Sequence, residues 1–413
     1  MIQMTNIKNN TINSTNNSSF TTENVKIIGL GKAGVKIVNN LGNFPEAQWL
    51  DIAAVDTDSS SIISSKLENS FLIGEEWTNG RGCGGNVIKG ERALAHKSNI
   101  QIEQFLKDSS LLVLVAGFGG GTATGGTPVI ARLARKQNIP VIYVITLPFS
   151  FEGHSKREIA ENQIHTLIRT SGTVIPIPND LLYSSLPAST PFEKAFEKSN
   201  IEVARAILGI SELLRYSNLI SVDLCDLHNL LCRQKSECGI GIGIADKKDG
   251  GNRTHFALKK LLESPLLGGR QRIKNADALI VSLTGGEDLT IGEMKHSLEN
   301  ISELASEHAE IIVGANTSSL YNDRVQFTVI PINFDEASEP IIEKYPKEKR
   351  EKISKSSVIK NIVKMKHEAV QLELPFENQS RGIFTSTSPT LHKGTDLDIP
   401  TFQRQRIHLD KGK

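Results

Sequence analysis

This sequence has almost no net charge, few cysteines and no long apolar run. Its 413 residues include 47 basic and 46 acidic side chains, so the net charge is +1 and no overall field favours a nucleic-acid partner. The four cysteines form no Cys-x-x-Cys motif, and Cys232 and Cys238 lack histidines at zinc-site spacing, which favours free thiols in a reducing cytoplasm. No stretch reaches the roughly 18 consecutive apolar residues of a membrane span. We therefore expect a cytoplasmic protein that binds no nucleic acid and does not insert into a membrane.

The first 189 residues divide into a polar extension and a domain of alternating strands and helices. Residues 1–24 are rich in Asn, Thr and Ser, lack the apolar core of a secretory signal and predict a disordered extension. Over residues 25–189, β-branched apolar runs alternate with helical patterns, which predicts a parallel sheet covered on both faces. The expected strands are 25–29, 51–55, 111–116, 141–145 and 174–177. The fold class is therefore α/β, with a Rossmann-like first domain.

The rest of the chain predicts a long helix, a second domain and a tail. Apolar residues recur at helical spacing over 190–216, which predicts one amphipathic core helix. A second domain of mixed helices and strands follows over 217–335, with expected strands at 278–283, 311–315 and 325–330. Residues 336–394 are rich in Glu, Lys, Ser and Pro and predict a flexible linker, part of which, about 341–372, could be transiently helical. Residues 395–413 form a separate terminal peptide.

The strongest indication of function is a glycine-rich turn after the expected strand 111–116. Glycines let backbone N–H groups crowd around an anion, and the helix N-terminus behind the turn adds a positive dipole. Two threonine hydroxyls supply further donors. The turn therefore predicts a phosphate cradle, formed by Gly119, Gly120, Gly121, Thr122, Ala123, Thr124 and Gly125.

A second glycine-rich turn follows the first expected strand in the pattern Gly-x-Gly-x-x-Gly, and its candidate ligand-binding residues are Gly29, Gly31, Lys32, Ala33 and Gly34. Asp56 ends the next strand, 22 residues after Gly34, where a dinucleotide-binding enzyme holds a ribose. Alone, this pattern favours an NAD-dependent oxidoreductase of the Rossmann class. Such an enzyme has no use for the second glycine-rich turn at 119–126. An NAD-dependent oxidoreductase and a protein that binds another phosphate-containing ligand therefore both remain possible at this point.

The sequence Gly-Gly-Gly-Thr-x-Thr-Gly at 119–125 resembles the signature loop of the tubulin/FtsZ family, and that of FtsZ most closely. The resemblance runs from residue 25 to 334 and returns near the C-terminus. Within it, residues 78–86 resemble the loop that closes over the terminal phosphate and contain Gly84 and Gly85. Residues 146–153 resemble the family's T-x-P-F-x-F-E-G, which implies that Glu152 lies at the ribose. Lys156 stands where the family usually has arginine.

The resemblance implies that the protein binds GTP or GDP together with Mg²⁺. Asn179 matches a family asparagine that contacts the nucleotide. Phe196 and Asn200 match the residues that stack on the guanine and hydrogen-bond to it. These two are four residues apart and therefore share one face of a helix, as a base-reading pair requires.

Asp223 and Asp226 follow the long helix and match two carboxylates of the family's catalytic loop. Such a pair could orient a water and help to hold a cation beside a phosphate, although from the residues alone both could instead cap a helix. In the family this loop enters the nucleotide site of the next subunit. The resemblance therefore implies a GTPase that assembles head to tail into filaments.

The terminal residues 397–404 resemble the short C-terminal FtsZ peptide. Apolar Ile399, Pro400 and Phe402 provide anchors, and basic residues follow them. The resemblance implies that 397–406 binds membrane-tethering division proteins and that the protein is located at the mid-cell division site. Departures from the family pattern leave a second possibility open, an FtsZ-like structural protein that hydrolyses GTP weakly; they are Ala123, Lys156, Ile201 and Ser221.

Overall fold

The computed structural model describes most of the chain between residues 24 and 334. The described residues are 24–95, 99–171, 173–184, 186–187, 189–214, 220, 222, 224–233, 236–250, 252–334, 391–392 and 395–396. Within the unit 344–413, β12 (Leu391–His392) and β13 (Thr395–Asp396) form a two-residue antiparallel ladder. The predicted N-terminal extension, the predicted linker and the predicted terminal peptide otherwise lie outside these residues.

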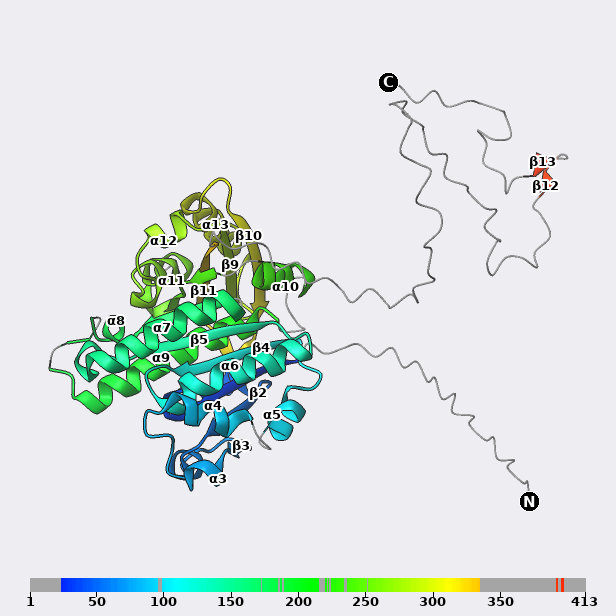
Figure 1. Cartoon of the computed structure of the whole chain (residues 1–413). Helices are drawn as coiled ribbons and strands as arrows, with labels where there is room; N and C mark the ends of the chain where they lie inside the picture. The colour runs from blue at the N-terminus through cyan, green and yellow to red at the C-terminus, as the bar shows by residue number, and fades with distance from the viewer. Residues whose placement is uncertain are drawn as a thin grey trace, which may run out of the picture. The chain divides into compact units, whose positions relative to one another are not determined.

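Six parallel strands form the first half of the sheet, in the order β3-β2-β1-β4-β5-β6 (Figure 1). They are β1 (Val25–Leu30), β2 (Asp51–Asp56), β3 (Asn69–Leu72), β4 (Leu111–Gly117), β5 (Val141–Leu147) and β6 (Thr173–Pro178). The five predicted strands of this region are confirmed. β3 was not predicted from the sequence, because this four-residue edge strand is half-exposed throughout and carries no apolar run.

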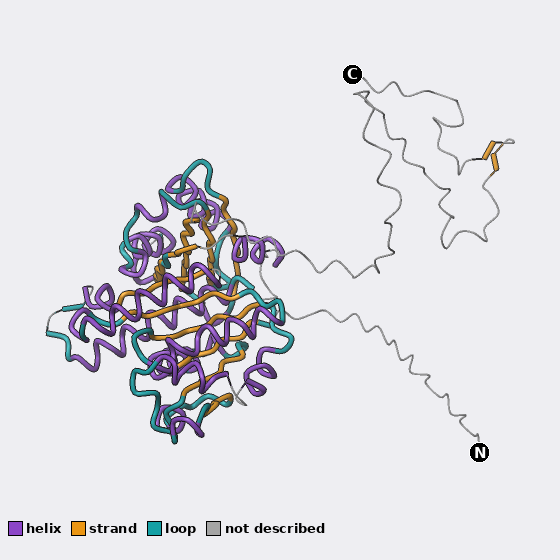
Figure 2. Tube along the Cα trace, in the orientation of Figure 1, coloured by secondary structure: helices purple, strands orange, loops and turns teal. Residues whose placement is uncertain are grey.

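Helices cover both faces of these six strands (Figure 2). The apolar side chains of α1 (Gly31–Gly42) and α9 (Phe192–Glu212) fill the core on one face. The other face is covered by α4 (Val87–Ala95), α5 (Asn99–Leu106), α6 (Gly121–Lys136) and α7 (His154–Ser171). This is the α/β fold that the continuous β-branched runs predict.

The second half of the sheet is mixed and continues the first. β7 (Ser236–Cys238) pairs parallel with β6 and antiparallel with β11 (Arg324–Phe334). β9 (Ala278–Gly285) and β8 (Gly241–Asp246) also pair with β11, and β10 (Glu310–Thr317) pairs with β9. The predicted strands in β9, β10 and β11 are confirmed. The three-residue β7 and the glycine-containing β8 were not predicted from the sequence.

None of the described helices is long and apolar enough to cross a membrane. Shorter elements connect the strands. The α-helices among them are α2 (Ser59–Ile63), α3 (Glu75–Thr78), α8 (Asn179–Ser184), α10 (Leu224–Arg233), α11 (Arg253–Leu262), α12 (Gln271–Lys274) and α13 (Ile291–Leu304). The 3-10 helices are η1 (Pro45–Ala47), η2 (Ser150–Glu152), η3 (Lys247–Asp249), η4 (Pro265–Leu267) and η5 (Ser319–Tyr321).

The core helix α9 connects the two halves. It was predicted over 190–216 and begins at Phe192, after Pro191, which has no N–H to donate. Gly209 lets α9 approach β11 very closely, because a Cβ there would lie 1.9 Å from Thr328 Oγ1. Near the end of α9, the buried Glu212 accepts a hydrogen bond from Asn316 Nδ2 at 2.7 Å. These contacts fix the helix against the second half of the sheet.

Candidate functional site

Three strand ends meet at one point of the sheet edge. β4 pairs with β1 on one side and with β5 on the other, so the turns after these parallel strands are neighbours. A Cβ on Gly117, at the end of β4, would lie 2.6 Å from Ala33 Cβ, and one on Gly31 would lie 3.2 Å from Ala123 Cβ. The two predicted glycine turns therefore form one continuous surface, at the place where open α/β sheets bind ligands.

The turn after β4 is shorter than the sequence predicts. A loop was expected through Gly126, but α6 begins at Gly121. Gly119 has φ +98°, and its N–H donates to the buried Thr124 Oγ1 at 3.0 Å, so Thr124 closes the turn. The glycines that follow are helical because α6 must pack closely against α4.

The glycines of the site divide into packing positions and open positions. A Cβ on Gly125 would lie 2.0 Å from Val87 O of α4, and one on Gly121 would lie 2.6 Å from Cys83 Cβ. Gly29 and Gly34 likewise let α1 approach the sheet, since a Cβ on Gly34 would lie 2.4 Å from Val115 O. At these four predicted ligand-binding glycines, the space that a side chain would occupy is filled by other protein atoms.

Three glycines face open space instead. A Cβ on Gly120, Gly84 or Gly85 would meet no atom within 4 Å. Gly120 directly precedes the N-terminus of α6, where unpaired backbone N–H groups favour an anion. The residues present therefore fit a phosphate group at this point.

Asp56 lies beneath the site and faces inward. Its side chain is 2% exposed, and its Oδ1 accepts a hydrogen bond from the Thr57 N–H at 2.7 Å. Burial raises the pKa of Asp56, although hydrogen bonds from Ser61 and Thr57 oppose the rise. Burial of this carboxylate weakens the argument that it hydrogen-bonds to a ribose as in a dinucleotide enzyme.

Lys32 is exposed in the first turn of α1, on the outer side of the site. The pKa of Asp58 is lowered, mainly by the hydroxyl and the N–H of Ser60 and also by the positive charge of Lys32. Lys32 therefore lies near Asp58, the residue that caps α2. It adds positive charge to the rim of the site.

The loop 78–86 is joined to the end of β2 by several hydrogen bonds. Gly82 N–H and Thr78 Oγ1 both donate to the Thr57 carbonyl, and Ser59 N–H donates to Gly80 O. Thr57 Oγ1 also lies 2.7 Å from Thr122 Oγ1 and 3.4 Å from Cys83 Sγ. Neither Thr57 nor Cys83 is among the site residues predicted from the sequence. Their spacing in the sequence gave no signal for this contact.

Glu152 and Lys156 lie beside the glycine turn, after β5. Glu152 Oε1 accepts a hydrogen bond from Phe149 N–H at 3.0 Å, and its Oε2 lies 3.4 Å from Lys156 Nζ. A Cβ on Gly119 would lie 3.2 Å from Lys156 O. The backbone of Lys156, which stands where the family usually has arginine, therefore lies next to the turn.

The predicted base-reading residues lie near the same edge. Phe196 packs edge-on against Phe149 and against Phe192, with centroid distances of 5.1 and 4.8 Å. Asn200 lies one turn further along α9 and is half-buried. Asn179 begins α8 directly after β6, and the neighbouring Asp180 accepts from Ser150 N–H, which joins α8 to the segment that carries Glu152.

The predicted catalytic aspartates follow the opposite end of α9. Asp226 is exposed in the first turn of α10, and Asp223 lies outside the described residues. α9 has 21 residues, which at about 1.5 Å per residue gives a length of roughly 30 Å. Ile220, just before the aspartates, pairs with Ala315 of β10. Figure 1 shows α10 and α8 on opposite sides of the folded body, so the structure does not bring Asp226 to the glycine turns of its own chain.

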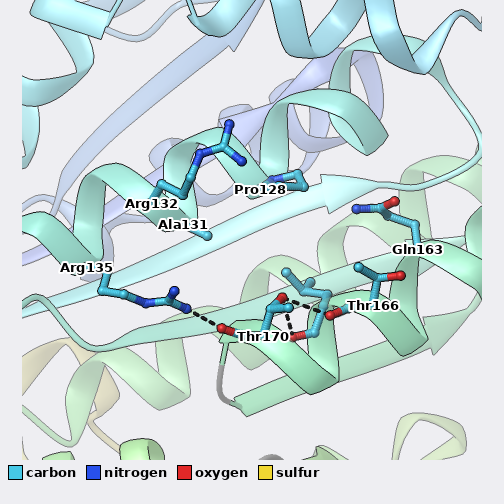
Figure 3. Close-up of a pocket in the computed structure, with 8 residues that line it drawn as sticks. Pro128, Ala131, Arg132, Arg135, Gln163, Thr166 and Thr170 are labelled. Atoms are coloured by element: carbon cyan, nitrogen blue, oxygen red, sulfur yellow. Dashed lines mark hydrogen bonds between the residues drawn. The ribbon is translucent and has the colours of Figure 1, made fainter. Parts of the chain in front are cut away.

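A separate cavity of about 280 Å³ lies between α6 and α7 (Figure 3). Arg135 of α6 reaches across it and donates a hydrogen bond to the Thr170 carbonyl of α7, whereas Arg132 is directed away from α7 and donates to Glu91 Oε1 at 3.3 Å. None of the predicted site residues lines this cavity. In the part of the chain that the structure describes, no group of three or more His, Cys, Asp or Glu side chains could hold a metal ion.

Comparisons with known proteins agree with this geometry. Residues 24–187 match the model of the Tubulin/FtsZ family GTPase domain, and residues 237–335 match that of the FtsZ family C-terminal domain. An empty FtsZ dimer from M. jannaschii is 30% identical over 75% of this chain and 88% of that chain, with a TM-score of 0.68.

Two further structures share the fold at lower identity. A GTPγS-bound protofilament of CetZ2 from Haloferax volcanii is 22% identical over 76% of this chain and 94% of that chain, with a TM-score of 0.60. A GDP-bound monomer of CetZ1 from the same organism is 19% identical over 75% of this chain and 93% of that chain, with a TM-score of 0.62. The comparisons give no support to a Rossmann oxidoreductase.

Proposed function

Because this chain belongs to the tubulin/FtsZ family and carries that family's GTPase domain, we propose that it assembles head to tail into GTP-dependent filaments. In such a filament the glycine turns of one subunit hold GTP, and the Asp223–Asp226 segment of the next subunit completes the site. A contact of this kind joins two different surfaces and does not close, so it produces filaments.

The observation that carries the proposal is the separation along α9. Phe196 and Asn200 lie in its first half, about 24 and 18 Å from its last residue at ~1.5 Å per residue, and Asp226 belongs to α10, which follows that far end. A carboxylate must come within hydrogen-bond reach of the attacking water, directly or through one further water. Asp226 can meet that requirement only at the site of a second copy.

Both proposed contact surfaces expose apolar side chains. Phe151 and Phe192, beside the glycine turns, are 64% and 59% exposed, and Ile220, before the aspartates, is 37% exposed. A neighbouring subunit would cover these side chains and gain hydrophobic stabilisation. The similar CetZ2 structure is that of a protofilament, which supports assembly into filaments.

The residues of the chain divide the chemistry between binding and activation. The N–H groups at the start of α6 hold phosphate oxygens, and Lys156 and Lys32 add positive charge at the rim. The partner's aspartates orient the water for attack on the terminal phosphate, so catalysis rests on positioning and electrostatics. Mg²⁺ would supply charge neutralisation at the phosphates. It would be held mainly by phosphate oxygens, because the described residues offer no cage of carboxylates.

Sedimentation with GTP, with GDP and without nucleotide tests the proposal directly. We expect filaments to pellet with GTP and Mg²⁺, and Asp226→Ala filaments to pellet but to hydrolyse GTP at least tenfold more slowly, as for loss of a positioned general base. Wild-type hydrolysis by protein that stays in the supernatant would contradict the shared site. Competition against a fluorescent guanine nucleotide tests the ligand, since GTP should displace it and neither ATP nor NAD should do so.

One observation favours slower hydrolysis than in an arginine-containing relative. Lys156 Nζ lies 3.4 Å from Glu152 Oε2, so part of its charge is directed at a neighbouring carboxylate. Lysine also lacks the planar fork with which arginine holds a phosphate. A GTP-binding filament protein with weak hydrolysis is therefore the second candidate, and the turnover of pelleted wild-type filaments separates the two.

We further propose that residues 397–406 bind a membrane-tethering division protein and direct the filaments to the mid-cell division site. The support is the order of apolar and basic residues in this segment, which suits a short portable ligand. Deletion of 396–413 should leave pelleting and hydrolysis intact and abolish localisation at the division site. Phe402→Ala should cause most of that loss, because short peptides concentrate binding in one or two anchors.

A further inference from the structure

Thr57 lies where three segments of the site meet. Its side chain is fully buried, at 0% exposure, between the end of β2, the loop 78–86 and the first turn of α6. Its Oγ1 lies 2.7 Å from Thr122 Oγ1 and 3.4 Å from Cys83 Sγ. Its backbone carbonyl accepts hydrogen bonds from Gly82 N–H, at 3.1 Å, and from Thr78 Oγ1, at 3.2 Å.

The fit between the loop and α6 depends on these contacts. Gly121 has no side chain, and a Cβ there would lie 2.6 Å from Cys83 Cβ and 2.7 Å from Asn86 O. The loop is therefore seated directly on the first turn of α6. A Cβ on either of its next two residues, Gly84 and Gly85, would meet no atom within 4 Å, and the same holds for Gly120 just before α6.

We propose that Thr57 is a positioning residue for the nucleotide. Through Thr122 and Cys83 it holds the loop 78–86 against the phosphate-binding turn, so that Gly84 and Gly85 are presented to the terminal phosphate. Thr57 itself is buried and does not touch the ligand. This inference rests on the proposed function, because it assigns Thr57 to the same GTP site.

The chemistry requires a hydroxyl at position 57. A hydroxyl can donate one hydrogen bond and accept others, so Thr57 can bridge Thr122 and Cys83 at once. Valine has the same shape without this ability and would leave the buried Thr122 hydroxyl without its partner. Serine keeps the bridge. A substitution series at this position therefore separates hydrogen bonding from packing.

The first test compares Thr57→Val with Thr57→Ser and with the control Thr127→Val. Thr127 is also fully buried, but its hydroxyl bonds only to Ala123 O of its own helix. We expect Thr57→Val to raise the Kd and KM for GTP about tenfold with little change in kcat, the scale of one buried hydrogen bond lost. Thr57→Ser should bind as wild type does, and so should Thr127→Val. Equal affinity in Thr57→Val and Thr127→Val would overturn the proposal.

The second test uses Cys83 as a reporter of loop opening. Nucleotide-free proteins are treated with methyl methanethiosulfonate, and the modified cysteine is identified by mass spectrometry. Cys83 is 6% exposed, so we expect it to react several-fold faster in Thr57→Val than in Thr127→Val. Equal rates would overturn the proposal. This test needs no nucleotide. It therefore still shows whether Thr57 holds the loop 78–86 in place, even in the case that wild-type protein does not bind GTP and the proposed function is wrong.

A third measurement covers the case in which Thr57→Val does not fold. In wild-type protein, GTP should slow the modification of Cys83 and leave the modification of Cys238, buried in β7, unchanged. Modification of Cys83 at the same rate with and without saturating GTP would show that the loop and the phosphate-binding turn are not coupled, and would overturn the proposal.

Discussion

At the residue scale, Asp56 is predicted to contact the ligand, and the structure shows that its side chain is almost fully buried. The sequence places it where a ribose-binding carboxylate would be, but the structure buries its side chain below the turns. The motif was visible in the sequence, whereas the direction of the side chain was not, because it depends on contacts with Thr57 and Ser61 from the following segment.

Asp56→Asn should stabilise the protein at neutral pH. Burial raises the pKa of Asp56 above its ordinary value of 3.8, so the ionised carboxylate is unfavourable in the folded state. That cost is present above the raised pKa and disappears as the pH falls below the ordinary value. We expect Asp56→Asn to have a higher Tm than wild type at pH 7 and an equal Tm near pH 3. A lower Tm at pH 7 would show that hydrogen bonds to the carboxylate outweigh its burial.

The pKa of Asp288 is shifted in the opposite direction to that of Asp56. Hydrogen bonds from Lys247 and from the buried Arg253, 3% exposed, lower the pKa of Asp288 to about 2. The stabilisation is therefore present above pH 3.8 and is lost as the pH falls toward 2. Asp288→Asn should lower the Tm at pH 7 by roughly 2–4 °C, for about 1 kcal/mol at a partly exposed pair.

The control for Asp288→Asn is Asp323→Asn, which also removes a carboxylate bound to Lys247 but at a 67% exposed position. We expect a smaller effect there, because water screens the pair. If the two variants have the same Tm at pH 7, or if the Asp288→Asn difference persists at pH 2, the assigned role of Arg253 is wrong.

At the scale of elements, the glycines between α4 and α6 are packing residues. A Cβ on Gly90 would lie 2.1 Å from Gly121 O, and one on Gly125 would lie 2.0 Å from Val87 O. Gly125→Ala should therefore separate the helices, destabilise the protein by about 1–3 kcal/mol and weaken GTP binding. Thermal unfolding and nucleotide titration measure these effects.

Gly292→Ala is the matched control for Gly125→Ala. Gly292 also lies in a helix, α13, but it is exposed and a Cβ there would meet nothing within 4 Å. We expect it to be stabilising by about 0.5 kcal/mol, because alanine loses less backbone entropy than glycine. Similar losses of stability in both variants would contradict the close packing of α4 on α6.

The elements could be predicted where local pattern determines them. The strands β1, β4 and β5 are buried and mostly apolar and were found, whereas the half-exposed β3 and the short β8, with its alternating glycines, were not. The start of α6 was placed too late, because its glycines suggest a loop. Only the tertiary contact with α4 explains why they are helical. The contact of Thr57 with Thr122 and Cys83 joins three segments far apart in the sequence, and no local pattern could show it.

At the scale of the whole molecule, the central feature is that its two functional ends are separated. The sheet is continuous from β3 to β10, and α9 packs against both halves. In the proposed function, nucleotide binding belongs to the glycine turns and activation to the segment that carries Asp226, which follows the far end of α9. Hydrolysis should then depend on contact between subunits, and its rate per subunit should rise with protein concentration.

The most direct measurement mixes two inactive variants. Gly120→Asp places a carboxylate in the open part of the phosphate-binding turn, at a backbone conformation that any residue can adopt, and Asp226→Ala removes the partner's carboxylate. Each variant alone should hydrolyse almost no GTP. In an equal mixture, about a quarter of the head-to-tail junctions pair an intact turn with an intact aspartate, so activity should recover to a corresponding part of the wild-type rate. Absence of recovery in filaments shown to contain both variants would mean that each site is complete within one chain, and would contradict the account.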